Sequence, residues 1–403
     1  MKPIKKQYQI INKILEERLN DVLPKVMNDS KADMWIICCK EYNEDPLFNA
    51  LVPANYPTAR RLCILAFVKD NNEIKKLSLC MPDEGVEKYY QRYYNFNEET
   101  QENALKRLLE EFKPKKIAIN KSSTFATSDG LSLGCYNTLA KVIDPSLFIS
   151  DDYLGLRLLE NRTKTELEYL PEVVNIAYKI IDEVFSKNNI NPGVTTCSDL
   201  EFLFREKVKN LGLDYWFEPD VDYQNLNTTN KRSYGVINYG DLIHCDFGIR
   251  YLHMCTDTQR LAYIAREDED KLPSSLIKAM KDNDRFQDIV SECMEVGKTG
   301  NEVLKKALEI GNQENLKPIL YSHPCNYFGH GPGPTIGLYN NQTSIPIRGE
   351  VTLINNTIWA LELNTTSTYN NETWQMFTEE TILFKDEKIN YLYPGRKEIK
   401  LIK

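Results

Sequence analysis

The stretch Leu242-Ile243-His244-Cys245-Asp246-Phe247-Gly248 decides the fold, together with Cys255-Thr256-Asp257-Thr258-Gln259-Arg260 a short distance after it. The first segment has the pattern of a buried strand that ends in an aspartate and a glycine. An ionised carboxylate at the end of a buried strand costs free energy unless it is paired or binds a metal. If the two segments are neighbouring strands of one hairpin, Asp246 and Asp257 can meet at a single site.

The same pattern recurs nearer the C-terminus with glutamates. Trp359-Ala360-Leu361-Glu362-Leu363 places one glutamate in an apolar strand, and Phe377-Thr378-Glu379-Glu380-Thr381-Ile382-Leu383-Phe384 places two in another. Tyr369-Asn370-Asn371 favours a turn between the two strands. Successive strand residues point to opposite faces, so only one of Glu379 and Glu380 can face the site.

Histidines are few, and one of them is framed by glycines. The four are His244, His253, His323 and His330, and His330 lies in Gly329-His330-Gly331-Pro332-Gly333. The sequence has neither an H-E-x-x-H helix nor a G-x-S-x-G elbow, which argues against two common hydrolase classes. Four carboxylates and one imidazole balance two divalent ions, and without metal the carboxylates would repel one another. Such an oxygen-rich set predicts manganese, with cobalt, iron and zinc as alternatives.

This order of two aspartates, one glycine-flanked histidine and two glutamates resembles metallopeptidase family M24, in its Xaa-Pro aminopeptidase and prolidase branch. The resemblance covers roughly residues 155–403. It implies an α+β fold, the pita-bread domain, in which helices pack on a curved antiparallel sheet. The beginning of the chain, with Lys40-Glu41-Tyr42-Asn43-Glu44-Asp45-Pro46, is similar to the smaller creatinase-type α/β domain. We therefore expect domains at 1–152 and 153–403.

The resemblance also implies roles for the five residues. Asp246 would be a terminal ligand of the first ion, and Asp257 and Glu379 would bridge both ions. His330 and Glu362 would complete the second site. A metal-bridging hydroxide would attack the scissile carbonyl, and Glu362 or Glu379 would carry the proton to the leaving amine.

Several positions depart from the family pattern. Gly337 and Asn326 stand where many members have further histidines, and Phe377 stands where an arginine is common. Leu363-Asn364 replaces the usual Pro-Gly after the first glutamate. We expect His323 to take over a catalytic role, with Asn326 and Tyr327 close to it in sequence. His244 is expected to support the site rather than bind metal, and His253 to lie in the loop between the aspartates.

The remaining pattern separates an α/β region from a later helical and strand-rich region. Helices are expected at about 5–28 and 97–113, and strands at 34–39, 61–68 and 116–119. After residue 150, two capping boxes, Thr165 to Glu168 and Ser198 to Glu201, predict long helices, and Gly212 can end the second. Pro171 marks a start or a kink. The ten cysteines show no CxxC pair, which favours reduced thiols.

Composition limits the partners. The net charge of −8 and pI near 5.4 argue against nucleic acid and anionic membranes. The sequence shows no signal peptide pattern, so we expect a cytoplasmic protein that acts on peptides and forms a homodimer. The predicted activity is a metallo-aminopeptidase that cuts the N-terminal bond of Xaa-Pro peptides. The alternatives are a prolidase-type dipeptidase, a non-peptidase amide hydrolase and a peptide-binding pseudoenzyme.

Overall fold

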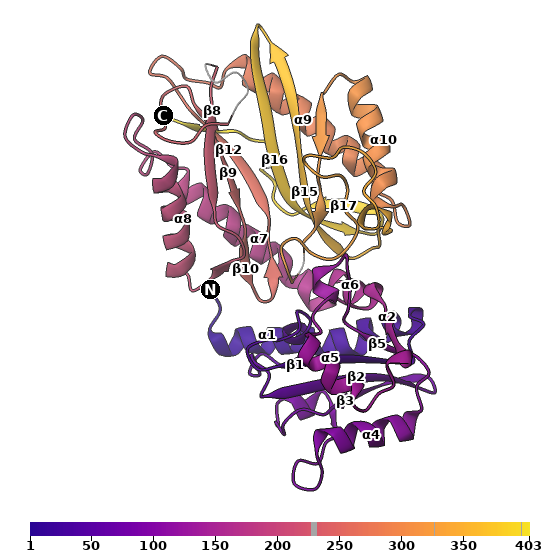
Figure 1. Cartoon of the computed structure of the whole chain (residues 1–403). Helices are drawn as coiled ribbons and strands as arrows, with labels where there is room; N and C mark the ends of the chain where they lie inside the picture. The colour runs from indigo at the N-terminus through magenta and orange to yellow at the C-terminus, as the bar shows by residue number, and fades with distance from the viewer. Residues whose placement is uncertain (227–231, 326, 396) are drawn as a thin grey trace. The chain divides into compact units, whose positions relative to one another are not determined.

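The computed structural model describes residues 1–226, 232–325, 327–395 and 397–403, which divide into two compact units (Figure 1). Residues 2–166 form the first unit, and residues 167–403 with Met1 form the second. The domain boundary at 152/153 stays a prediction.

A mixed six-stranded sheet, in the order β4-β3-β2-β1-β5-β6, forms the centre of the first unit. The strand β1 pairs antiparallel with β2 and parallel with β5. All residues of β1 except Lys40 are buried, as expected for a strand covered on both faces. The three predicted strands are confirmed as β1, β2 and β5. The strands are β1 (Met34–Lys40), β2 (Leu62–Asp70), β3 (Glu73–Ser78), β4 (Gln91–Arg92), β5 (Ile117–Ile119) and β6 (Phe148–Ser150).

The predicted leading helix is confirmed as a succession of α1 (Ile4–Glu17), the π-helical turn η1 (Arg18–Val22) and α2 (Leu23–Asp29). The predicted second helix is α4, whose Leu105 and Leu108 share a core with Ile36 of β1. Besides α1, η1 and α2, the helical segments of this unit are α3 (Phe48–Leu51), α4 (Gln101–Phe112), α5 (Leu133–Ala140), α6 (Asp152–Glu160), η2 (Val86–Lys88), η3 (Ala126–Ser128) and η4 (Pro145–Leu147).

The second unit is built on a nine-stranded, mainly antiparallel sheet. Its main path runs β13-β15-β16-β12-β9-β8, with β14 on β15, β17 on β16 and β18 parallel to β12. A small three-stranded sheet, β11-β10-β7, lies apart from it. The strands are β7 (Asp214–Tyr215), β8 (Asp220–Gln224), β9 (Leu242–Phe247), β10 (Ile249–Tyr251), β11 (Met254–Cys255), β12 (Thr258–Ile264), β13 (Pro318–Leu320), β14 (His323–Pro324), β15 (Thr357–Tyr369), β16 (Glu372–Lys385), β17 (Lys388–Tyr391) and β18 (Lys400–Ile402).

Helices cover this sheet, which confirms the predicted α+β class. The segments are α7 (Lys164–Val184), α8 (Cys197–Asn210), α9 (Ser274–Cys293), α10 (Gly300–Gln313) and the short η5 (Arg348–Glu350). The helices α9 and α10 were not predicted, although Phe286 and Val290 of α9 share one core with Trp359 of β15. None of the helices in the described part of the chain combines the length and apolar character that a membrane crossing requires.

Both predicted capping boxes are wrong by two residues. The hydroxyl of Thr163 accepts from the amide of Glu166, whose carboxylate accepts from the amide of Thr163. In α8 the reciprocal pair is Thr196 and Asp199. In each region, two overlapping pairs of a hydroxyl residue and an acid three positions later could form the capping box. Tertiary contacts select one pair, because Thr165 instead donates from its amide and its hydroxyl to the carboxylate of Glu17. Pro171 lies inside α7, and α8 ends before Gly212, whose φ is +65°.

The expectation that all cysteines are reduced is also wrong for the structure. Cys63 of β2 and Cys80, which follows β3, form a disulfide with a Cα–Cα distance of 4.4 Å. Because they are far apart in sequence, only the pairing of β2 with β3 brings them together. The other eight cysteines are outside this disulfide and are buried.

Candidate metal centre

The predicted carboxylates lie in one row across neighbouring strands of the second unit. Asp246 of β9 is opposite Gln259 of β12, and Gln259 is opposite Glu379 of β16. Glu379 is in turn opposite Glu362 of β15. Side chains that are opposite each other in register share a face of the sheet, so the two hairpins deliver their acids to the same place. Asn370 and Asn371, with φ of +51° and +62°, form the predicted turn between β15 and β16.

Asp257 joins this row from the residue before β12. It is two positions from Gln259 and therefore points to the same face. Its backbone is fixed on both sides by one hydroxyl: Thr381 accepts from the amide of Asp257 at 2.9 Å and donates to its carbonyl oxygen at 2.8 Å.

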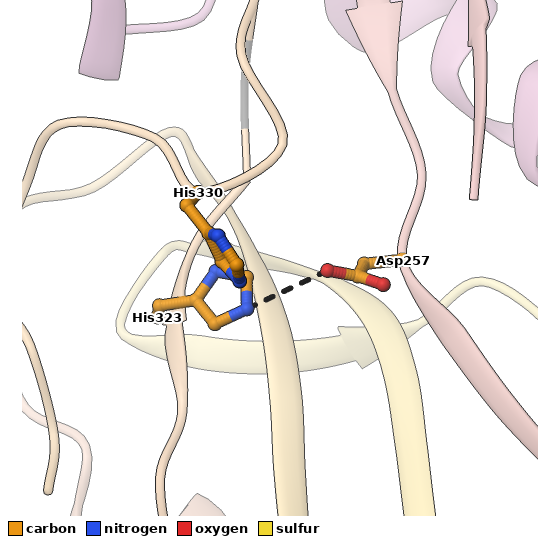
Figure 2. Close-up of side chains that lie close together, drawn as sticks. All are labelled: Asp257, His323 and His330. Carbon is orange, nitrogen blue, oxygen red and sulfur yellow. Dashed lines mark ion pairs between the residues drawn. The ribbon is translucent and has the colours of Figure 1, made fainter. Parts of the chain in front are cut away.

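Two histidines reach the acids from the segment before β15. Figure 2 shows the rings of His323 and His330 close together, with His323 directed at Asp257. The ring centroids are 4.6 Å apart, and Nε2 of His323 lies 3.5 Å from Oδ2 of Asp257 and 3.9 Å from Oε1 of Glu379. Nδ1 of His323 lies 3.0 Å from the carbonyl oxygen of Pro324, which can only accept, so Nδ1 carries the proton. The lone pair of Nε2 therefore faces the carboxylates.

Trp216, which the sequence did not single out, forms a wall beside His330. Its indole ring lies 5.0 Å from the imidazole, and its Nε1 donates to the carbonyl oxygen of Thr256 at 2.9 Å. A Cβ atom on Gly329 would come within 2.0 Å of the indole. Glycine before His330 is therefore a steric requirement, in agreement with the close approach that the motif predicts.

Glu380 points away from the site. Arg260 donates to both of its carboxylate oxygens, one at 2.9 Å, and the hydroxyl of Tyr178 donates to it at 2.6 Å. The structure thus separates the two adjacent glutamates, with Glu379 on the side of the predicted metal ligands and Glu380 in an ion pair on the other face.

The remaining histidines lie near the site without entering it. His244 is buried, with Nδ1 at 3.1 Å from Asp222 and Nε2 at 3.0 Å from the side-chain oxygen of Gln259. His253 has a φ of +61° in the turn between β10 and β11, and its ring packs 5.0 Å from that of Tyr327. Asn326, which was considered as a replacement for a family histidine, lies outside the described residues.

Burial and mutual repulsion dominate the electrostatics of the acids. Burial raises the pKa of Asp246 to about 6, and burial with the charge of Asp246 raises the pKa of Glu362 to about 8. Burial and neighbouring carboxylates raise the pKa values of Asp257 and Glu379 well above their usual range. Four acids in this arrangement cannot all be ionised without positive charge nearby.

The residues fit a divalent metal centre. Oδ1 of Asp246, both carboxylate oxygens of Glu379 and Nε2 of His323 have no hydrogen-bond partner among the described residues, although they are buried. Such atoms cost free energy unless a cation or donor satisfies them. Three overlapping groups have ligand atoms that all lie within 4.8 Å of one another: Asp257, His323 and His330; His323, Glu362 and Glu379; Asp246, Asp257 and Glu379. The structure therefore brings all five predicted ligands together and adds His323.

Known proteins resemble this chain in sequence and in fold. Residues 168–386 match the model of metallopeptidase family M24. A protein of Mycoplasma pneumoniae with the provisional name Xaa-Pro aminopeptidase is 27% identical over 176 residues, which are 43% of this chain and 46% of that protein. The chain thus matches about half the length of this curated relative.

Solved structures of the same branch superpose over both units. The X-Pro aminopeptidase of Thermotoga maritima has a TM-score of 0.67 at 16% identity and covers 94% of this chain and 99% of its own. The Xaa-Pro dipeptidase of Bacillus anthracis has a TM-score of 0.60 at 17% identity, with coverage of 97% and 99%. These similarities confirm the predicted pita-bread fold and the resemblance to the Xaa-Pro peptidase branch. Since the family model matches more than half of its length, the chain belongs to metallopeptidase family M24.

Proposed function

We propose that this protein is a two-metal peptidase that removes the N-terminal residue from Xaa-Pro peptides. The observation that carries the proposal is the overlap of the three ligand groups. Asp257, His323 and Glu379 each belong to two of the three groups, which supports two adjacent ions with shared ligands. Manganese is the proposed metal, because carboxylate oxygens outnumber the imidazoles in the set.

The bound ions would supply a hydroxide at neutral pH and polarise the scissile carbonyl group. The chain's own residues perform the other tasks. Asp257 and Glu379 would hold the shared position, Asp246 and Glu362 the outer ones, and the imidazoles would close the set on the opposite side.

Proton transfer to the leaving amine is assigned to Glu362 or Glu379. Both face the site, and a carboxyl group whose pKa is raised above its usual range is suited to accept a proton and return it. His323 is better suited to bind an ion than to stabilise an oxyanion. Its proton is on Nδ1 and engaged by Pro324, so Nε2 offers a lone pair rather than a donor.

The preference for proline is supported by the names of the relatives and by nothing in the site itself. A prolidase-type dipeptidase is the second candidate, because the Bacillus anthracis structure carries that activity in its name. An amide hydrolase with another substrate and a peptide-binding pseudoenzyme on the same fold are the remaining alternatives. We also propose a homodimer in the cytoplasm.

The test is cleavage of a peptide panel by metal-stripped protein to which manganese is returned. The panel contains Xaa-Pro dipeptides, Xaa-Pro-Xaa tripeptides and matched peptides without proline, with products identified by mass spectrometry. Metal-dependent release of the first residue from tripeptides is the expected result. Cleavage of dipeptides alone would favour the dipeptidase, and two bound ions without any cleavage would overturn the peptidase assignment.

A further inference from the structure

A continuous chain of hydrogen bonds reaches Glu362 from the edge of the sheet. Arg232 pairs with Asp222 at 3.1 Å, and the same carboxylate oxygen lies 3.1 Å from Nδ1 of His244. Nε2 of His244 lies 3.0 Å from Oε1 of Gln259, and Nε2 of Gln259 donates to Oε1 of Glu362 at 2.6 Å. His244 and Gln259 are each only 2% exposed, so water competes little for these contacts.

The donor and acceptor chemistry of these groups gives the series of hydrogen bonds one direction. The amide oxygen of Gln259 only accepts, so Nε2 of His244 donates to it, while Nδ1 of His244 lies 3.1 Å from Asp222 and 3.4 Å from Nη1 of Arg232. The amide nitrogen of Gln259 only donates, so Glu362 accepts this hydrogen bond. That orientation directs the amide oxygen of Gln259 towards His244. Each hydrogen bond of the series therefore fixes the orientation of the next side chain.

The position of Gln259 makes this role specific. It lies in register between Asp246 and Glu379, and it is a neutral side chain within a row of acids. A glutamate of the same length would add another negative charge and repel Glu362. Glutamine instead brings a donor to the same place, and Phe377, on the same face as Glu379, stacks under Arg232 at 4.6 Å.

We propose that Gln259, oriented by His244 and Asp222, is a positioning residue that fixes one oxygen of Glu362 and leaves the other free to bind a metal ion. This inference rests on the proposed function. A carboxylate held at one oxygen rotates less freely, and one lone pair of that oxygen is committed to the hydrogen bond. The hydrogen bond would therefore set both the affinity of the adjacent ion and the geometry of its ligands.

The first experiment is a titration of metal-stripped protein with Co²⁺, followed by calorimetry and by the visible absorption spectrum. We expect Gln259→Met to weaken binding of one ion by about 10- to 100-fold and to change the cobalt spectrum. Gln224→Met is the matched control, because Gln224 is also buried in the sheet, and its side-chain hydrogen bonds among residues 1–226, 232–325, 327–395 and 397–403 go to the backbone of residue 375. It should bind Co²⁺ as the unaltered protein does.

Two further variants test the direction of the chain. Gln259→Glu keeps the length of the side chain, so a loss of affinity in this variant, with an unchanged melting temperature, would separate positioning from packing. His244→Leu should weaken Co²⁺ binding less than Gln259→Met. Adding it to Gln259→Met should cause little further loss, because in this proposal His244 orients Glu362 through Gln259.

The outcomes separate this inference from the proposed function. Unchanged Co²⁺ affinity and spectrum in Gln259→Met, beside an active unaltered protein, would overturn the inference and leave the peptidase assignment intact. Weaker binding in Gln259→Met, with no peptide cleaved by the unaltered protein, would support the inference and overturn the assignment. If the unaltered protein bound no Co²⁺, both would be wrong.

Discussion

The adjacent residues Glu379 and Glu380 point to opposite faces of β16 and have opposite surroundings there. Glu380 has Arg260 and Tyr178 as partners, and Arg260 also lies over the rings of Tyr178 and Tyr393, which stack at 3.7 Å. Glu379 is equally buried, but neither of its oxygens has a hydrogen-bond partner among the described residues. A paired buried charge serves the fold, whereas an unpaired one among other acids is a position prepared for a cation.

The largest expected effect is on activity, from Glu379→Gln. Loss of a shared metal ligand should lower kcat/KM on the best Xaa-Pro peptide by at least about 1,000-fold, which corresponds to about 4 kcal/mol of transition-state stabilisation. The metal-free variant should be at least as stable as the unaltered protein, because a repelled charge is removed. Full activity in this variant would contradict the metal assignment.

The opposite pattern is expected for Glu380→Gln. This change leaves Arg260 buried without its counter-charge, which should lower the free energy of unfolding by about 3–5 kcal/mol. Metal affinity, measured by calorimetry on folded protein, should stay within a factor of about three. If Glu380→Gln lost its metal affinity and kept its stability, Glu380 rather than Glu379 would serve the metal site.

The pH dependence of stability should sharpen the contrast. The pKa of Glu362 is raised to about 8, so its folded form holds a proton more strongly than the unfolded form does. Its contribution to stability is present below its ordinary pKa and is lost as pH rises through 8. The melting temperature of metal-free protein should therefore fall, by on the order of 5 °C, between pH 5 and pH 9.

Manganese should reverse this trend, because ions bind ionised carboxylates and metal affinity increases with pH. Melting scans in chelator and in manganese, over the same buffers, make the comparison. Parallel curves in the two conditions would argue that the acids do not bind the metal.

A smaller effect is expected from His323→Gln. The amide cannot reproduce the imidazole lone pair that faces Asp257 and Glu379, so metal affinity should fall by about 10- to 100-fold. Excess manganese should restore much of the activity if His323 acts mainly as a ligand. If saturating metal restores none, His323 contacts the substrate or the transition state instead.

The smallest expected effect on activity is from Tyr178→Phe, which removes one hydrogen bond to Glu380 and keeps the aromatic ring. Stability should fall by about 1.5–3 kcal/mol, since the acceptor is charged. Urea unfolding measures this change, and kcat/KM should be unaltered. A loss of activity at constant stability would show that the contacts of Glu380 on one face of β16 also influence the predicted metal ligands on the other face.

The sequence by itself determined the class of fold, and it singled out the four acids and the one imidazole of the predicted metal set. Local patterns suffice for these, because alternating or continuous apolar runs define strands, and a charge inside such a run has to be paired or bound. The predicted hairpin turn at Asn370 and Asn371 follows from residues that tolerate positive φ.

Only the tertiary structure decided which partners each residue has. Both capping boxes begin two residues earlier in the structure than the sequence predicts. Cys63 pairs with Cys80, and Trp216 lies against His330. The tertiary structure also joined His323 to the metal ligands and connected Gln259 to Glu362. These contacts join residues that are distant in sequence, and they depend on the register in which the strands pair. The alternation of side chains along a strand shows which residues share a face, but it leaves the register undetermined.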